Sequence, residues 1–157
     1  MAPSSPSITA TELDEAGLLA MAGRLAAVLQ AGDVLLLSGD LGAGKTTFAR
    51  GVLRALGHAG EVPSPTFLLV EPYASPPLRL PVLHADLYRL EAGALVDDLG
   101  LDEALDEGVL ILEWPERLPQ GRYPGALRLR LEGAGAPARR LTWEAGPAWK
   151  GRWPPAR

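Results

Sequence analysis

The sequence has no cysteine, and only two of its 157 residues are histidine and two are lysine. Without cysteine the chain can form no disulfide, no thiolate nucleophile and no cysteine-based metal site, and two histidines exclude a histidine-rich zinc centre. No apolar run approaches the roughly 18 residues of a membrane-spanning helix. The first residues also lack the basic start and apolar stretch of a secretory signal. Together these absences predict a cytoplasmic protein.

The length fits a single domain. Both ends are rich in Pro, Gly and Ala, which predicts loose segments over residues 1–10 and 146–157 around one folded domain over residues 11–145. The net charge of −4 is unfavourable for a protein that binds nucleic acid without the help of another protein.

The charge is unevenly distributed. Residues 1–116 hold 17 acidic and 6 basic side chains, whereas residues 117–157 hold 9 basic and 2 acidic ones. Either the basic end balances an acidic body, or it forms a face for an acidic partner or for RNA held mainly by another protein.

Apolar periodicity predicts an α/β fold of the three-layer P-loop NTPase type, with a mixed, mainly parallel sheet flanked by helices. A first helix is predicted to start near Thr11, which would act as its N-cap, and to stop at Gly32. The stretch between residues 72 and 81 is too short for a crossover helix, so the strands on either side are predicted to pair antiparallel. The predicted strands are residues 34–37, 66–70, 80–84, 109–112, 126–131 and 140–143, and the later helices are residues 46–56 and 91–107.

A phosphate-binding loop is predicted between the first strand and the helix that starts at residue 46. Its glycines permit backbone angles that turn successive amides toward phosphate oxygens, and the helix N-terminus adds partial positive charge. The lysine supplies a mobile charge to the β- and γ-phosphates, and the first threonine hydroxyl reaches Mg²⁺. A glycine turn alone does not explain a lysine at this position in a chain whose other basic residues are almost all arginine. The predicted nucleotide-binding residues are Gly39, Asp40, Leu41, Gly42, Ala43, Gly44, Lys45, Thr46 and Thr47.

Two carboxylates are candidates for the acidic partner that a P-loop requires near Mg²⁺. Glu113 follows a buried strand and is predicted to touch the metal or position water. Asp86 can hold the metal indirectly, orient the attacking water, or cap the next turn. His84 is interpreted as a packed or hydrogen-bonded histidine rather than a catalytic base.

The tripeptide Ser64-Pro65-Thr66 lies between the P-loop helix and the next strand. Nucleotide switches commonly place a γ-phosphate sensor there. Pro65 extends the preceding residue and limits the freedom of the loop. An ordinary strand entry is the alternative interpretation.

These motifs, in this order and spacing, resemble the TsaE family (also called YjeE-like), small bacterial P-loop ATPases required for tRNA threonylcarbamoyladenosine (t6A) modification. The resemblance covers about residues 10–145. It is carried by four segments together: residues 39–51, 64–67, 84–90 and 113–116.

The resemblance implies roles for individual residues. Thr46 and Glu113 would be Mg²⁺ ligands, and Asp86 would be needed for hydrolysis of ATP. Trp114 would lie beside the active site, and Glu15 would approach the nucleotide. The Ser64–Thr66 segment would act as the switch, and Arg139 and Arg140 lie where the family has a nucleotide-contacting arginine.

The resemblance also implies a partner. The protein would bind the TsaD–TsaB complex, which attaches the threonylcarbamoyl group to adenosine in certain tRNAs, and would meet tRNA only indirectly. ATP hydrolysis would reset that complex between turnovers. The choice of ATP over GTP rests on the resemblance, because the sequence has no base-specificity motif.

Two other functions share the P-loop. A small-molecule kinase needs an arginine-rich lid, but Arg79 and Arg89 are the only arginines between the P-loop helix and Glu113. A nucleotide sensor or scaffold would not need the two carboxylates for hydrolysis. For a partner-activated ATPase, Arg89 is the nearest candidate for an arginine finger by motif.

Overall fold

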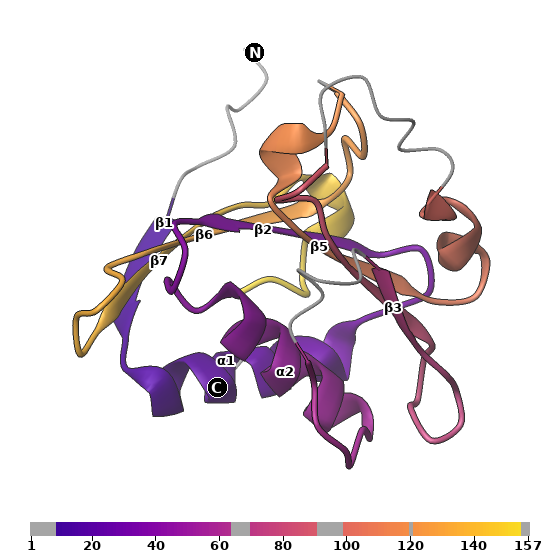
Figure 1. Ribbon diagram of the computed structural model, residues 1–157, viewed down its shortest axis with the longest axis horizontal. Helices are drawn as coiled ribbons and strands as arrows, with labels where there is room; N and C mark the ends of the chain where they lie inside the picture. The colour runs from indigo at the N-terminus through magenta and orange to yellow at the C-terminus, as the bar shows by residue number, and fades with distance from the viewer. Residues whose placement is uncertain (1–8, 64–69, 91–98, 120, 155–157) are drawn as a thin grey trace.

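The computed structural model describes residues 9–63, 70–90, 99–119 and 121–154, which form one seven-stranded sheet with two α-helices (Figure 1). The strands are β1 (Thr9–Leu13), β2 (Val34–Gly39), β3 (Val70–Tyr73), β4 (Val82–Asp86), β5 (Val109–Glu113), β6 (Leu127–Glu132) and β7 (Arg139–Glu144). The helices are α1 (Glu15–Val28) and α2 (Lys45–Leu56), with short 3₁₀ turns η2 (Glu103–Asp106), η3 (Pro115–Arg117) and η4 (Pro147–Trp149). None of the helices in these ranges is long and apolar enough to cross a membrane.

The sheet is mixed, with strand order β1-β7-β6-β2-β5-β4-β3. Its central strands β6, β2, β5 and β4 are parallel, while β3 pairs antiparallel with β4 and β7 pairs antiparallel with β6 and β1. The predicted fold class and the β6–β7 hairpin are therefore confirmed, and an antiparallel pair lies at the β4 edge of the sheet as predicted. Its outer strand is β3, at residues 70–73, whereas the strand predicted over residues 66–70 lies outside the described residues except for Val70. The parallel core places the carboxyl ends of β2, β4 and β5 at one edge, where ligands bind in open α/β sheets.

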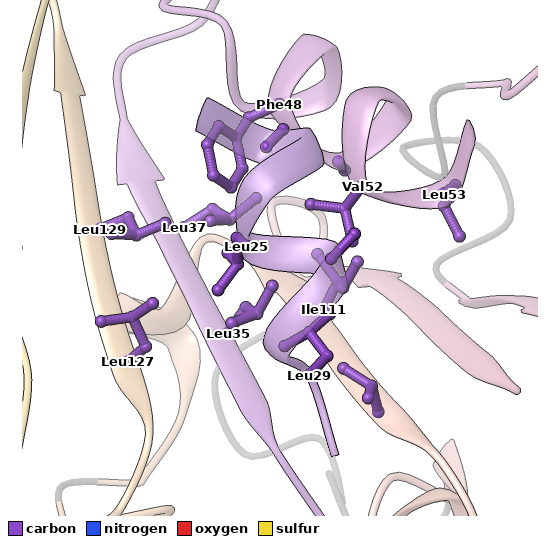
Figure 2. Packing of buried hydrophobic residues seen from close by; sticks show 14 of the residues in the cluster. Leu25, Leu29, Leu35, Leu37, Phe48, Val52, Leu53, Ile111, Leu127 and Leu129 are labelled. Carbon is purple, nitrogen blue, oxygen red and sulfur yellow. The ribbon is translucent and has the colours of Figure 1, made fainter. Parts of the chain in front are cut away.

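Both α-helices cover the same face of the sheet (Figure 1). The buried apolar side chains on this face form one cluster, which we call the helix-side core and which also includes Val82, Trp149 and Trp153. Figure 2 shows part of it: Leu25 of α1 and Leu29 just after it, Phe48, Val52 and Leu53 of α2, and Leu35, Leu37, Ile111, Leu127 and Leu129 of the sheet. The opposite face is covered in the described residues by turns and 3₁₀ segments around Leu87, Leu101 and Leu118. Because β2 and β5 are buried on both faces, their sequences are continuous apolar runs rather than alternating ones.

The N-cap of the first helix lies three residues later than predicted, at Asp14, so the prediction of Thr11 as the N-cap is wrong. Asp14 is the N-cap, and its side chain accepts a hydrogen bond of 2.8 Å from the Gly17 amide. The residues before Asp14 form β1 instead, because β7 offers them an edge to pair with. The helix ends at Val28, before the turn in which Gly32 adopts a positive φ of 93°.

The acidic stretch predicted as a helix over residues 91–107 lies partly outside the described residues. From residue 99 onward it forms turns and η2 rather than an α-helix. Gly100, with φ of 74°, interrupts any continuous helical run there.

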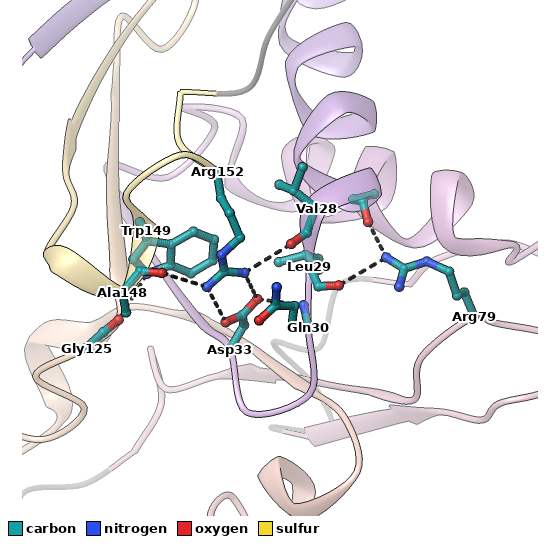
Figure 3. A network of polar contacts seen from close by, with 10 residues as sticks. Val28, Leu29, Gln30, Asp33, Arg79, Gly125, Ala148, Trp149 and Arg152 are labelled. Carbon is teal, nitrogen blue, oxygen red and sulfur yellow. Dashed lines mark hydrogen bonds and ion pairs between the residues drawn. The ribbon is translucent and has the colours of Figure 1, made fainter.

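The predicted loose C-terminal segment instead packs on the domain over residues 146–154 (Figure 3). Trp149 is only 1% exposed, and its indole nitrogen donates a 3.0 Å hydrogen bond to the Gly125 carbonyl. The Arg152 guanidinium makes contacts of 2.6 and 3.0 Å with both carboxylate oxygens of Asp33 and donates to the Val28 carbonyl at 3.0 Å. The tail thereby satisfies a carbonyl at the end of α1 that would otherwise lack a helical partner.

Candidate nucleotide-binding site

The candidate site is a cavity of about 460 Å³ above the carboxyl ends of β2, β4 and β5. Its volume lies within the usual range for small-molecule pockets, about 300–1,000 Å³. The cavity is lined by residues from the P-loop and the start of α2, from α1, from the strand ends and from the β6–β7 turn: Glu15, Leu18, Leu41, Gly42, Gly44, Lys45, Thr46, Thr47, Asp86, Glu113, Trp114, Ala136, Pro137 and Arg139.

The P-loop glycines hold backbone angles that other residues adopt only with strain. Gly39, Gly42 and Gly44 have φ angles of 140°, 78° and 111°. A Cβ atom on Gly39 would lie 2.3 Å from the carbonyl oxygen of Leu131 on the neighbouring strand. Gly44 is the N-cap of α2 and has no side chain to occupy the helix N-terminus, so the first turn of α2 faces the cavity.

Lys45 is buried beneath the loop. Its Nζ donates to the carbonyl oxygens of Gly39 and, at 3.0 Å, of Asp40. The same atom lies 4.3 Å from the centre of the Trp114 ring, a cation–π contact. The ammonium is thus held at the floor of the cavity by neutral groups.

Burial lowers the pKa of Lys45 from its ordinary value of 10.5, because a charged ammonium loses water there. Nearby carboxylates, Glu113 first and then Asp86, oppose that decrease. A phosphate group near Nζ would act in the same direction as these carboxylates and favour the charged form.

Glu113 and Thr46 are in direct contact. The Thr46 hydroxyl lies 3.0 and 3.1 Å from the two carboxylate oxygens of Glu113. In the β4–β5 register Asp86 is paired with Glu113, so the two carboxylates end adjacent parallel strands side by side. His84 is completely buried and does not line the cavity, but its Nε2 lies 2.7 Å from Glu113 Oε2.

Asp86 has the capping role that its sequence position leaves open, and it also faces the candidate site. It lines the cavity, and its Oδ1 also accepts a 2.8 Å hydrogen bond from the Tyr88 amide, so it caps the turn after β4. Tyr88 in turn packs on Trp114, with ring centres 4.8 Å apart and ring planes tilted by 43°. The capped turn therefore fixes one wall of the site.

The structure brings most of the other predicted residues to the cavity. Glu15, the first residue of α1, lines it, and so does Trp114, which follows β5 directly in a left-handed conformation with φ of 62°. Leu41 lies at the rim and is 62% exposed. Arg89, by contrast, is exposed and does not line the cavity, so its position does not support the predicted arginine finger. The Ser64–Thr66 switch segment lies outside the described residues.

Sequence reasoning missed the contribution of the β6–β7 turn. Ala136, Pro137 and Arg139 line the cavity, and Arg139 Nε donates a 3.1 Å hydrogen bond to the Ala43 carbonyl in the P-loop. The neighbouring Arg140 is exposed, because successive residues of a strand point to opposite faces. The family resemblance was the only indication that Arg139 lies near the nucleotide. The Gly-, Ala- and Pro-rich sequence of the turn itself does not predict which part of the protein the turn will contact.

Residues 13–141 match the family described as "Threonylcarbamoyl adenosine biosynthesis protein TsaE". The chain belongs to the TsaE family. It is 44% identical over 112 residues to "tRNA threonylcarbamoyladenosine biosynthesis protein TsaE" of Streptomyces coelicolor, a match that covers 71% of this chain and 76% of that protein. The Bacillus subtilis protein of the same name is 43% identical over 131 residues, covering 80% and 78% of the two chains.

A solved structure supports the same assignment. The crystal structure titled Bacillus subtilus YdiB superposes with a TM-score of 0.72 and 31% sequence identity, covering 95% of this chain and 93% of that one. The TsaE resemblance and the α/β fold that it implies are thus confirmed. As a member of this family, the chain is placed in the biosynthesis of threonylcarbamoyladenosine in tRNA.

Proposed function

We propose that this protein binds ATP with Mg²⁺ and hydrolyses it as an accessory component of the cytoplasmic tRNA t6A-modifying machinery. The observation that carries the proposal is the contact of the Thr46 hydroxyl with both oxygens of Glu113, next to the buried Lys45 ammonium and under a glycine loop. A P-loop needs these three groups together, namely a cation, a hydroxyl and a carboxylate.

The donor set fits Mg²⁺. A hydroxyl and carboxylate oxygens are the hard ligands that this ion prefers, and Mg²⁺ usually takes only one or two carboxylates from a protein and completes its shell with phosphate and water. The described residues contain no group of three or more His, Cys, Asp and Glu side chains that could hold a metal by themselves. Thr46 and Glu113 would therefore hold the ion together with the nucleotide, and the ion would neutralise charge on the phosphates.

The remaining groups would act on the nucleotide and on water. Lys45 would exchange its backbone carbonyl partners for phosphate oxygens, and the loop and α2 amides would surround the phosphates. Asp86 lies beside Glu113 and is held by the Tyr88 amide, so it is placed to accept a hydrogen bond from the attacking water. Trp114 covers Lys45 and restricts solvent there.

We infer a slow ATPase from the cations of the cavity. Among the described lining residues the only cations are Lys45 and Arg139, and both donate to backbone carbonyls. An additional positive charge from a partner would stabilise the transition state, an effect worth about 10³–10⁵ in rate in other P-loop enzymes. We propose the TsaD–TsaB complex as that partner, with tRNA contacted only indirectly.

A phosphate-release assay tests this function. The wild-type protein should release phosphate slowly with Mg·ATP and much faster when TsaD and TsaB are added. Glu113→Ala should lower the stimulated rate by about 100-fold or more, and Lys45→Ala should abolish nucleotide binding in calorimetry. A fast rate that is indifferent to the partners would contradict the proposal.

Two further readouts separate the alternatives. Transfer of the γ-phosphate to a metabolite rather than to water would indicate a kinase. Full support of tRNA modification by the Asp86→Ala and Glu113→Ala variants would indicate a nucleotide-dependent scaffold without essential hydrolysis.

A further inference from the structure

His84 is a completely buried polar side chain directly beneath the candidate metal site. On β4 it lies two residues before Asp86 and two after Val82, and Val82 belongs to the helix-side core, so all three point to the face covered by α2. In the β4–β5 register His84 is opposite Ile111, which makes Glu113 its diagonal neighbour toward the cavity.

The His84–Glu113 contact is a directed hydrogen bond. The distance from Nε2 to Oε2 is 2.7 Å, and a carboxylate can only accept, so Nε2 carries the hydrogen and donates it. The second ring nitrogen, Nδ1, is buried and has no hydrogen-bond partner among the described residues.

This arrangement is costly for a side chain that serves only as packing. A buried polar atom without a partner destabilises a protein, whereas an apolar side chain of similar size would avoid that cost. The presence of a histidine at this position is therefore better explained by the hydrogen bond from Nε2 to Glu113 than by packing in the core.

We propose that His84 is a positioning residue that fixes the Glu113 carboxylate for Mg²⁺; this inference rests on the proposed function. Oε2 receives His84 at 2.7 Å and Thr46 at 3.1 Å, whereas Oε1 has only the Thr46 contact at 3.0 Å among the described residues. His84 thus donates to Oε2 from the buried side of Glu113 and leaves Oε1 as the oxygen available to the ion. Histidine and carboxylate partners that orient a metal ligand typically contribute about 10–100-fold to metal affinity.

The neighbouring carboxylate provides a contrast. Asp86 receives a hydrogen bond from the Tyr88 amide in its own turn, so the local backbone helps to orient it. Glu113 has a longer side chain with more rotatable bonds, and the donors to its oxygens, Thr46 and His84, both lie on other elements of the fold. Substitution of His84 should therefore affect Glu113 selectively.

The test is a comparison of His84→Leu with His84→Gln by calorimetry. Leucine keeps the volume and removes the donor, whereas the glutamine amide nitrogen can reach the place of Nε2. For each protein the affinity for ATP is measured with Mg²⁺ and with EDTA. The ratio of the two affinities measures how much Mg²⁺ contributes to ATP binding. We expect His84→Leu to lower this ratio by about 10-fold or more, with ATP affinity in EDTA unchanged, and His84→Gln to restore it to within about 3-fold of the wild type.

A second part of the experiment uses Glu113→Gln, which should remove most of the gain in ATP affinity that Mg²⁺ provides. In that background His84→Leu should change the ratio no further, because the ligand that it orients is already lost. If His84→Leu does not fold, as judged by circular dichroism, His84→Asn replaces it: its amide is as polar as that of glutamine but too short to reach Glu113. His84→Asn should then show the loss and His84→Gln the recovery.

The outcomes separate the two proposals. A wild-type protein whose ATP affinity does not respond to Mg²⁺ would overturn the metal site of the proposed function. Two results would overturn only the role of His84. Either the wild type shows a normal ratio that His84→Leu or His84→Asn leaves unchanged, or the variant loses the same ATP affinity in Mg²⁺ and in EDTA.

Discussion

Gly39 and Gly42 belong to the same loop and both have positive φ angles, but their surroundings differ. A side chain on Gly39 would meet the Leu131 carbonyl at 2.3 Å, whereas nothing lies within 4 Å of the corresponding position on Gly42. At Gly39 the requirement for glycine is thus both conformational and steric. At Gly42 it is conformational only.

Alanine substitutions should separate these two requirements. We expect Gly42→Ala to lower the free energy of unfolding by about 1–2 kcal/mol, the cost of a left-handed angle for an L-residue. Gly39→Ala should cost at least about 2 kcal/mol more, because strand β6 must shift away from β2. Urea denaturation measures both. Equal losses would mean that the backbone accommodates the added methyl group without moving β6.

At the scale of elements, the two helices approach closely at one residue. Gly51 of α2 faces α1, and a Cβ there would lie 2.8 Å from Ala22 Cβ and 3.1 Å from Leu19 Cδ2. Gly23 of α1 has more room, since its nearest neighbour would be Ala55 Cβ at 4.0 Å. The close contact fixes the position of α2, whose first turn carries Lys45 and Thr46.

The same substitution in the two helices should have opposite effects. Gly23→Ala should stabilise the protein by about 0.5–1 kcal/mol, the gain in helix propensity. Gly51→Ala should destabilise it by about 1–3 kcal/mol, because overpacking outweighs that gain. Chemical denaturation of both variants measures the difference. A stabilising Gly51→Ala would contradict the tight helix contact.

At the scale of the whole molecule, the chain end closes the helix-side core. Trp149 and Trp153 belong to that core, and Arg152 stacks on the Trp149 ring at 4.3 Å while it binds Asp33 (Figure 3). The tail thus connects the end of α1, the start of β2 and the loop before β6.

Substitution of Trp149 tests the contribution of the tail to stability. We expect Trp149→Ala to lower the free energy of unfolding by about 3–5 kcal/mol, the usual cost of removing a buried large aromatic side chain. The adjacent Lys150 is exposed, so Lys150→Ala should change stability by less than about 0.5 kcal/mol. Denaturant titration of both variants checks this. Similar small effects would show that the tail is as loose in solution as its composition predicts.

Local patterns alone predicted the P-loop, helix α2, the buried strands β2 and β5, and the β6–β7 hairpin. These features depend on the chain's own dihedral preferences and apolar periods, which contiguous residues carry. Trp149 shows the limit of this reasoning, because its Pro- and Gly-rich neighbours indicate a loose end although its ring is buried.

Residue types and spacing were thus enough to predict the glycine-rich loop, the lysine, the threonine hydroxyl and the two carboxylates of the candidate site, along with the strands beside them. The folded chain was needed to show that residues 9–13 are a strand, that Arg139 reaches the P-loop and that His84 donates to Glu113. Each of these depends on a contact between residues distant in the chain, whose partner is set by strand order and register rather than by any local preference.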